Sequence, residues 1–312
     1  MNAAAVAASV RASRGLAHKR DVGRLGMLAG AGAYRNGDDC AAIPAGDGYL
    51  LLAIEGLVAE FVAADPWFAG YSAVMVNASD VAAMGGRTTA VVDALWCRDV
   101  ERGVVIVAGM RAAAAAYGIP LVGGHTNARD DREQIAVAIL GRANRLLTSF
   151  DARPGDALCV AVDLRGAMHQ RFAYFNASVG ADPERLRGDL EVLPRLAESG
   201  RCRAAKDVSM AGVLGTALML LEGSEIGATV ELDAIPRPAA VPLERWLAAF
   251  PSYGFVLALD AADVGAVGES FASRGICFGV IGTCDASRRL IVRDDMGATA
   301  AVWDLAVEPL LA

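Results

Sequence analysis

Strand-like and helix-like patterns alternate in two successive rounds along this chain of 312 residues. Short β-branched or apolar runs predict strands, and longer stretches of small apolar residues predict helices. The expected strands of the first half are 49–54, 88–95, 119–122 and 134–142, and its expected helices are 69–84 and 100–117. The second half gives expected strands at 157–163, 228–232, 253–259 and 276–281, and expected helices at 182–199, 211–222 and 261–274. Such alternation is typical of α/β or α+β layers in each half.

A turn-rich segment separates the two halves. Ser149, Pro154 and Gly155 stand between two strand-like runs, and Pro and Gly favour turns over regular structure. A chain of this length is also expected to form two domains, at roughly 100–200 residues each. The sequence therefore predicts an N-terminal domain over 1–150 and a C-terminal domain over 151–312.

Hydropathy argues against a membrane protein. Hydrophobic residues make up 54% of the chain and the mean hydropathy is +0.37. The longest charge-free apolar runs, such as 208–221, are nevertheless about 14 residues, short of the roughly 18–20 that span a bilayer. The six cysteines form no CxxC pair, which favours buried free thiols in a reducing cytoplasm. The Ala-rich, basic N-terminus is similar in composition to a transit peptide, but we interpret it as an amphipathic first helix.

The formal net charge of −7 is unevenly distributed. Residues 1–150 contain 14 basic and 14 acidic side chains, whereas residues 151–312 contain 15 basic and 22 acidic ones. No segment is basic enough to indicate a nucleic-acid partner. The neutral, apolar first half is the better candidate for a contact between two copies of the chain.

Two clusters of acidic residues suggest a cation site. Asp38 and Asp39 follow Gly37, and adjacent ionised carboxylates repel unless they face water or a cation. A polar turn is the alternative. Asp80 lies three residues after Asn77, on one face of a helix otherwise made of small apolar residues. An acid is costly to bury there without a partner, so this face either approaches a ligand or is a helix cap or solvated stripe.

Two further segments could bind phosphate. One is the run of Gly123, Gly124, His125, Thr126 and Asn127. It follows an expected strand, and a Gly-Gly turn lets backbone amides approach an anion; a plain loop is the alternative. The other segment contains Lys206, Asp207 and Ser209, before the helix expected at 211–222. That helix N-terminus could order a phosphate, although Ser209 is also a natural N-cap.

The segment after the strand expected at 157–163 concentrates polar and aromatic side chains in an otherwise aliphatic chain. Loops at strand ends are where α/β folds place ligand contacts, and arginine forks bind carboxylate or phosphate. We expect His169, Arg171 and Asn176 to contact a second, anionic substrate. The alternative is a surface loop whose aromatic side chains only cap the core.

Taken in order, these motifs resemble the superfamily of aminoimidazole ribonucleotide (AIR) synthetase, thiamine-monophosphate kinase, selenophosphate synthetase and the hydrogenase-maturation carbamoyl dehydratase. The landmarks are the GDD turn at 37–39, the strand ending in Glu55, the GG[D/H]T segment at 123–126, the D-x-S element at 207–209 and the Ile-Pro pair at 235–236. The most specific landmark is N-x-S-D-x-x-A-M-G at 77–85. Segments 206–216 and 246–255 look closest to the AIR synthase-related branch, which includes methanogenesis-marker-2-like proteins.

The resemblance implies a two-domain AIR synthase-like fold, a homodimer formed by the N-terminal domains, and a cleft that binds ATP with Mg²⁺. Carried over to this chain, the phosphate–metal ligands are Asp38 or Asp39, Glu55, Asp80, and Asp207 with Ser209. Together with the motifs above, the expected ATP or phosphate contacts are Gly37, Asp38, Asn77, Gly123, Gly124, His125, Thr126, Asn127, Lys206 and Ser209.

Three positions depart from the kinase pattern. Glu55 keeps the charge of the family's acid but adds a methylene, His125 replaces an aspartate as in the selenophosphate synthetases, and Met210 replaces the second aspartate of D-x-S-D-G. Mg²⁺ prefers oxygen ligands, so His125 and Met210 remove ligands and argue against thiamine-monophosphate kinase activity itself. Residues 23–37 contain no cysteine, which argues against selenophosphate synthesis.

The leading hypothesis is an enzyme that uses Mg·ATP to phosphorylate, or activate as a phosphate, an oxygen of a small metabolite. The alternative is a nucleotide-binding or scaffold protein of the same fold that has lost catalysis. His125 and Met210 favour this alternative. The acids that stay at the family's motif positions, Asp38, Asp39, Asp80 and Asp207, favour the enzyme.

Overall fold

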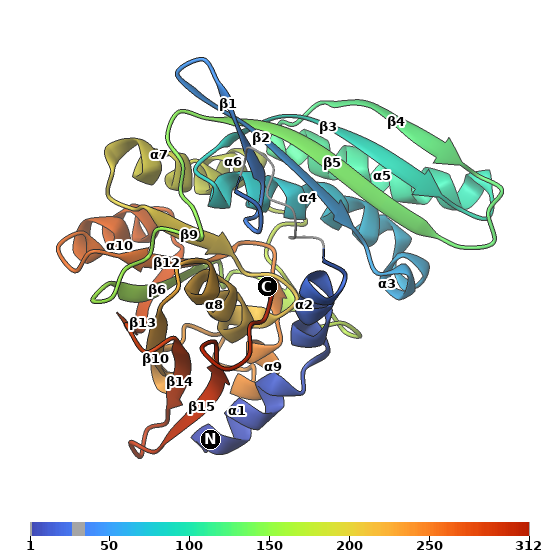
Figure 1. Ribbon diagram of the computed structural model, residues 1–312. Coiled ribbons are helices and arrows are strands. Elements are labelled where there is room, and N and C mark those ends of the chain that lie inside the picture. The colour runs from blue at the N-terminus through green and yellow to red at the C-terminus, as the bar shows by residue number, and fades with distance from the viewer. Residues whose placement is uncertain (1, 27–34, 312) are drawn as a thin grey trace. The chain divides into compact units, whose positions relative to one another are not determined.

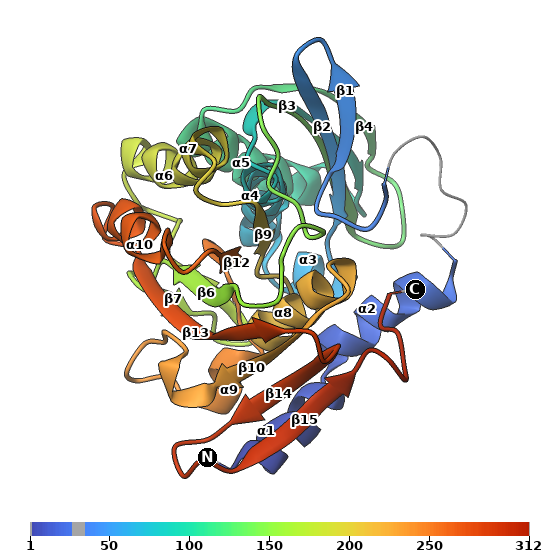
Figure 2. The same ribbon diagram turned by 60° about the vertical axis from the view of Figure 1, so that its left-hand side comes forward.

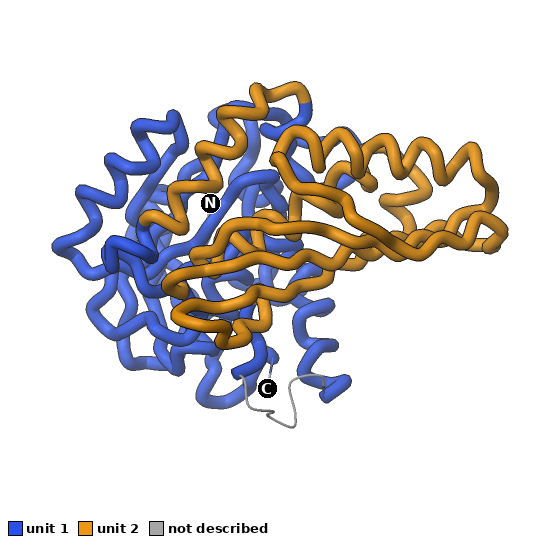
Figure 3. Tube along the Cα trace, turned by 90° about the horizontal axis from the view of Figure 1, so that it is seen from above, with its two compact units in different colours: residues 1–38, 147–179, 196–312 blue, residues 39–146, 180–195 orange. Residues whose placement is uncertain are grey.

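The structure, a computed structural model, describes residues 2–26 and 35–311. Residues 27–34, part of the cysteine-free segment noted above, lie outside the described residues. The chain divides into two compact units, coloured in Figure 3. Unit 1 contains Met1–Asp38, Leu147–Val179 and Leu196–Ala312, and unit 2 contains Asp39–Leu146 and Gly180–Arg195. The units differ from the continuous segments 1–150 and 151–312 expected above. The first 38 residues pack with the C-terminal part of the chain, and Gly180–Arg195 pack with unit 2.

Unit 2 is built on a five-stranded sheet with the order β1-β2-β5-β3-β4 (Figure 1). Its strands are β1 (Ala41–Ala45), β2 (Gly48–Gly56), β3 (Arg87–Trp96), β4 (Leu121–Asn127) and β5 (Gln134–Ala143). Its helices are α3 (Ala59–Ala64), α4 (Pro66–Ala83), α5 (Val100–Tyr117) and α6 (Pro183–Leu190), followed by the start of α7 (Val192–Ser199). The strands β3 and β4 are parallel, and the other neighbours in this sheet are antiparallel.

Helices α4 and α5 cover one face of this sheet (Figure 2). They approach each other at glycines: a Cβ added at Gly70 would lie 2.0 Å from the carbonyl oxygen of Ile106, and one at Gly109 would lie 1.9 Å from that of Trp67. The small residues of the expected helix at 69–84 therefore serve close packing against a second helix. The buried side chains beneath these helices include Val91, Leu95, Val137 and Ile139.

Unit 1 contains a seven-stranded sheet with the order β15-β14-β10-β13-β6-β12-β9 and a small sheet with the order β11-β8-β7. The large sheet is formed by β6 (Ala157–Val162), β9 (Ala204–Asp207), β10 (Gly227–Glu231), β12 (Gly254–Leu259), β13 (Cys277–Asp285), β14 (Arg289–Arg293) and β15 (Thr299–Asp304). The small sheet is formed by β7 (Ala167–Met168), β8 (Tyr174–Asn176) and β11 (Phe250–Pro251).

The helices of unit 1 are α1 (Ala3–Arg11), α2 (Arg14–Arg24), α8 (Gly212–Gly223), α9 (Leu243–Leu247) and α10 (Val264–Ala272). Helix α1 lies beside β15 in both ribbon views, and the Ala3 amide donates to Asp294 at its start. The apolar side of the N-terminal region is thus part of the core of unit 1. The structure confirms a mixed α/β fold.

Two expectations about local structure are wrong. The helix expected at 182–199 is interrupted at Glu191, and it restarts as α7 with Pro194 in its first turn, where a proline costs no hydrogen bond. The glycines at 123 and 124 do not form a turn after a strand: they lie inside β4, in register with Val92 and Asp93 of β3.

Among the described residues, no helix has both the length and the apolar character that crossing a bilayer requires. All six cysteines are free, and Cys277 alone among them is exposed. Burial raises the pKa of the Cys159, Cys202 and Cys284 thiols to about 12, so these side chains stay protonated at neutral pH. They behave as small core residues of unit 1.

Candidate functional site

Helix α4 carries Asn77 and Asp80, the polar pair of the N-x-S-D-x-x-A-M-G landmark. Pro66 occupies its first turn, and the Asp65 side chain accepts a hydrogen bond from the Phe68 amide, so the helix start is capped. From there the helix is buried along nearly its whole length, including Asn77, which is 0% exposed, and Asp80, which is 5% exposed. Asp80 is therefore an acid within a buried helix, not part of a solvated stripe.

Asp80 lies close to a second carboxylate of unit 2. Asp39 and Asp80 each present a carboxylate oxygen, and these atoms lie within 4.8 Å of each other. Two ionised carboxylates at this distance repel, and burial weakens the screening by water. A divalent cation removes that repulsion, and carboxylate oxygens are the ligands that Mg²⁺ prefers. The donor set of Asp39 and Asp80 therefore fits a magnesium ion.

Asn77 connects α4 to the sheet beside this pair. Its Nδ2 donates to the carbonyl oxygens of Ala73, at 2.8 Å, and Val137, at 3.0 Å. These bonds fix the orientation of the amide. Its Oδ1 is buried and has no hydrogen-bond partner among the described residues, which leaves an acceptor for a water molecule or ligand.

The sheet row that contains Val137 adds two more acids. In the register, Glu55 of β2 pairs with Val137, and Val137 pairs with Asp93 of β3. Glu55 is exposed, and Asp93 is half-buried. Neighbouring residues in register point to the same face of a sheet, so both acids share the face that α4 covers. Glu55, expected from the sequence as a metal ligand, is thus on the same side of the sheet as Asn77.

Asp93 is an acid that the sequence analysis missed. Desolvation raises the pKa of its carboxyl above the usual range. A Cβ added at Gly124 would lie 2.2 Å from its Oδ1, so the carboxylate occupies the space beside that glycine. Gly124 is therefore required by a neighbouring side chain, whatever its role toward phosphate. A single acid inside the β-branched run at 88–95 was the available signal.

The remainder of β4 is an exposed edge strand. The ring centroids of His125 and Trp96 lie 6.4 Å apart, and the Asn127 side chain accepts a hydrogen bond from the Arg129 amide. His125, Thr126 and Asn127 are all exposed. Their proposed contacts with ATP, like those of Gly123 and Gly124, stay predictions.

Asp38 has a different environment from its neighbour Asp39. In unit 1, its carboxylate accepts hydrogen bonds from the Ser149 amide, at 2.8 Å, and the Ser149 hydroxyl, at 2.6 Å. The Lys206 ammonium lies 3.9 Å away, and both charged side chains are buried. Asp38 thus anchors the segment around Ser149 and neutralises Lys206. The sequence left Asp38 and Asp39 as alternatives for the metal, and the geometry within unit 2 favours Asp39.

The D-x-S element lies at the end of β9. Asp207 is buried and pairs with Phe255, and the Ser209 amide donates to the Thr216 hydroxyl. Ser209 is not the N-cap of α8, because that helix begins at Gly212. The Ser209 hydroxyl is buried and has no hydrogen-bond partner among the described residues. The assignment of Asp207, Ser209, Lys206 and Gly37 to phosphate or metal stays a prediction.

Two of the residues expected to contact a substrate, His169 and Asn176, accept hydrogen bonds from backbone amides in the turns around β7 and β8. His169 Nδ1 accepts hydrogen bonds from the amides of Arg171 and Phe172, and Asn176 Oδ1 accepts from those of Ser178 and Val179. Each side chain therefore shapes its own loop. This local role leaves the substrate contact of His169, Arg171 and Asn176 a prediction.

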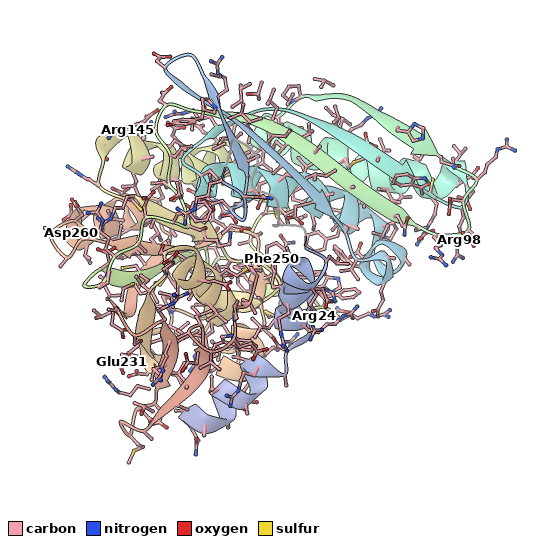
Figure 4. The ribbon with its side chains drawn as sticks, viewed as in Figure 1. Arg24, Arg98, Arg145, Glu231, Phe250 and Asp260 are labelled. Atoms are coloured by element: carbon pink, nitrogen blue, oxygen red, sulfur yellow. The ribbon has the colours of Figure 1, made fainter. Side chains whose placement is uncertain are left out.

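The aromatic side chains of this segment pack on one another. The rings of Phe172 and Tyr174 stack with centroids 5.5 Å apart, and Tyr174 meets Phe250, labelled in Figure 4, edge to face. Because these rings cover one another, they form a small core over the β11-β8-β7 sheet. This packing is compatible with both interpretations of the segment, a substrate-binding loop and a loop that caps the core, so both stay predictions.

Comparison with known proteins agrees with this fold. The model of the AIR synthase related protein N-terminal domain matches residues 37–143, and that of the C-terminal domain matches residues 155–295. An uncharacterized protein of Synechocystis sp. is 44% identical over 304 residues, covering 95% of this chain and 94% of the relative. The thiamine-monophosphate kinase of Halobacterium salinarum is 30% identical over 231 residues, covering 70% and 77%.

Among solved structures, PurL of T. maritima complexed with ATP is similar, with a TM-score of 0.72 and 20% identity. The match covers 86% of this chain and 46% of the PurL chain, so this chain spans about half the length of that protein. At this identity the likeness shows the fold alone. The two domain matches together cover most of the chain, and they show that it belongs to the AIR synthase related protein family.

Proposed function

We propose that this protein is an enzyme that uses Mg·ATP to phosphorylate, or activate as a phosphate, an oxygen of a small metabolite. The observation that carries the proposal is the Asp39–Asp80 pair, with carboxylate oxygens within 4.8 Å of each other. Two like charges beside a buried helix repel each other, and a bound cation turns this repulsion into attraction. The names of related proteins, which include a kinase, support the use of ATP.

In this proposal, Asp39 and Asp80 hold Mg²⁺, which when bound neutralises charge on the phosphate oxygens. The chain's own contribution is positioning. The capped helix α4 fixes Asp80, and the bond from Asn77 to Val137 fixes the helix against the sheet. Phosphoryl transfer requires mainly metal ligands and alignment of the reacting groups, so acids held in fixed positions can support it.

The second candidate is a nucleotide-binding or scaffold protein without catalysis. It is favoured by His125 and Met210, which stand where the kinase pattern has acids. The two candidates differ in turnover: both bind Mg·ATP, but only the enzyme consumes it.

The test is phosphate or ADP release from ATP with Mg²⁺ or Mn²⁺, screened with small hydroxylated or carboxylated metabolites. The enzyme predicts metal-dependent turnover that Asp80→Asn abolishes. The matched control is Asp47→Asn, because Asp47 is exposed in the β1–β2 turn. Binding of Mg·ATP without turnover for any metabolite supports the scaffold, and absence of both contradicts both candidates.

We also propose a cytoplasmic homodimer formed by the sheet of unit 2. The face opposite α4 and α5 exposes Leu52, Ile54 and Val92, at 48%, 68% and 42%. Ile54 and Val92 lie in one sheet row, joined by Ala138. An apolar sheet face of this kind is typical of protein interfaces. A mass in solution of 32.3 kDa alone would contradict the dimer.

A further inference from the structure

Residues of unit 1 line a cavity of about 430 Å³. This volume is in the range of small-molecule sites, which is roughly 300–1,000 Å³. The cavity lies at the ends of α2 and α8 and is bounded by residues 35–37 and by Leu311. Its lining residues are Gly23, Gly26, Arg35, Asn36, Gly37, Phe150, Met219, Glu222, Gly223, Glu225 and Leu311.

The lining is rich in hydrogen-bond acceptors. Helices α2 and α8 both end at the cavity, and the C-terminus of a helix carries unpaired carbonyl oxygens and a partial negative charge. Two carboxylates, Glu222 and Glu225, lie in the same wall. The cavity therefore favours a ligand that offers N–H donors and positive charge.

Neither carboxylate has an ion-pair partner within the part of the chain that the structure describes. Glu222 accepts hydrogen bonds only from the backbone amides of Leu310 and Leu311. Glu225 is exposed and has no side-chain hydrogen bond there. The nearby cation at the end of α2, Arg24 (labelled in Figure 4), pairs with Asp21 at 3.6 Å. The lining thus contains two carboxylates and one guanidinium, that of Arg35.

The Arg35 guanidinium shows how the cavity binds a planar cation. Its Cζ lies 3.6 Å from the centroid of the Phe150 ring, in a cation–π contact. Its Nη2 donates to the carbonyl oxygen of Gly223 at 2.9 Å, at the C-terminus of α8. An aromatic face and a helix-end carbonyl therefore already recognise one flat nitrogenous cation, and the cavity keeps its volume with Arg35 in place.

We propose that this cavity is a binding site for a small nitrogenous cation, an amidinium, guanidinium or protonated amino-heterocycle on a compact apolar body. Phe150 and Met219 contact the apolar body, and Glu222 and Glu225 neutralise the charge. Arg35 competes for the same surface. The site is independent of the Asp39–Asp80 pair and holds whether or not the protein uses ATP.

The experiment compares benzamidine with benzamide by titration calorimetry on the full chain. The two molecules have nearly the same shape, but only benzamidine is charged at neutral pH. We expect benzamidine to bind and benzamide to bind at least tenfold more weakly. Equal binding of both, or no binding of benzamidine, would overturn the proposal.

Three variants locate the binding. Glu225→Gln removes one exposed charge and should weaken benzamidine binding about two- to fivefold, whereas Glu244→Gln, an equal charge loss on α9, should leave it unchanged. Asp80→Asn should also leave it unchanged, which separates this site from the metal pair. Equal effects of Glu225→Gln and Glu244→Gln, or loss of binding in Asp80→Asn, would place the ligand elsewhere.

Arg35→Met gives a prediction of opposite sign. The substitution removes a competing cation and frees the Gly223 carbonyl, so benzamidine should bind more tightly, by about two- to fivefold. If the Arg35 side chain only maintained the shape of the cavity, its loss would weaken benzamidine binding. Unchanged or weaker binding in folded Arg35→Met, verified by circular dichroism, would contradict the competition.

Discussion

Asp38 and Asp39 are neighbours in the chain, yet their surroundings differ. Asp38 is neutralised by Lys206 and held by two hydrogen bonds from Ser149. Asp39 instead lies with its carboxylate oxygen within 4.8 Å of another acid, Asp80. The first arrangement balances the charge of the acid within the chain, and the second is the one that we propose binds a cation. The contrast teaches that the partner of an acid, more than its position in a motif, indicates its role.

The largest effect is expected at Asp38. Asp38→Ala removes a carboxylate beside the buried Lys206 and both bonds to Ser149, so it should reduce the free energy of unfolding by about 3–5 kcal/mol. Urea denaturation measures this loss. Asp47→Ala, in an exposed turn, should change the free energy by less than about 0.5 kcal/mol. If the two variants were equally stable, Asp38 would not be an anchor.

The next effect concerns turnover. Asp80→Asn keeps the shape of the side chain but removes a charge that would balance Mg²⁺. We expect ATP turnover to fall at least about 100-fold, equivalent to roughly 2.7 kcal/mol. Phosphate release measured over a range of Mg²⁺ concentrations checks this, with Asp47→Asn as the control. A normal rate in Asp80→Asn would break the contrast between the two acids.

A smaller effect has the opposite sign. Asp39→Asn relieves the repulsion with Asp80, so in EDTA it should raise the free energy of unfolding by about 0.5–2 kcal/mol. The same substitution should abolish stabilisation by added Mg²⁺. Thermal unfolding with and without the metal measures both. Destabilisation of the metal-free protein by Asp39→Asn would mean that this acid is an anchor like Asp38.

The smallest effects are pH-dependent and extend the comparison to Asp93 and Glu191. Hydrogen bonds from the Arg87 guanidinium, the shortest at 2.8 and 2.9 Å, hold the pKa of Glu191 below its usual range. The stability that Glu191 contributes is therefore present above the unfolded pKa and is lost as the pH falls through the lower folded pKa. Glu191→Gln should cost about 0.5–1 kcal/mol at pH 7 and almost nothing near pH 3.

Asp93 should behave in the reverse way, because desolvation raises the pKa of its carboxyl. Its charged form destabilises the fold above that pKa, and protonation relieves the cost as the pH falls. Asp93→Asn should therefore stabilise the protein at pH 7, by less than about 1 kcal/mol, and have little effect at low pH. Urea denaturation at pH 7 and near pH 3 measures the stability change in Glu191→Gln and in Asp93→Asn. Changes of the same sign in the two variants at pH 7 would contradict these two predictions.

The sequence predicted local structure well where one periodicity runs without interruption. The helix expected at 100–117 is α5 to the residue, and β-branched runs became β3 and β5. It failed where a distant partner decides the structure. Glycines that suggested a turn lie inside β4, where the Asp93 carboxylate occupies the space that a side chain at position 124 would need. The break at Glu191 was signalled by Pro194, which an uninterrupted helix would have placed in its interior.

The candidate site was predicted in part. Asp80 and Asn77 could be selected because polar residues stand out on an apolar helix, and family motifs added Glu55 and the adjacent acids. Nothing local could show which of Asp38 and Asp39 lies beside Asp80, because Asp38 is fixed by Ser149, which is 111 residues away. Arg35 and Phe150 are likewise far apart in the chain, so the cavity of unit 1 left no sequence signal.

Titration calorimetry of Mg·ATP into the wild type, Asp80→Asn and Asp47→Asn tests the metal–nucleotide role of the Asp39–Asp80 pair most directly. The pair predicts equal affinities for the wild type and Asp47→Asn, and an affinity at least about tenfold lower for Asp80→Asn, equivalent to roughly 1.4 kcal/mol. An unchanged affinity in folded Asp80→Asn would show that α4 does not bind the nucleotide or its metal.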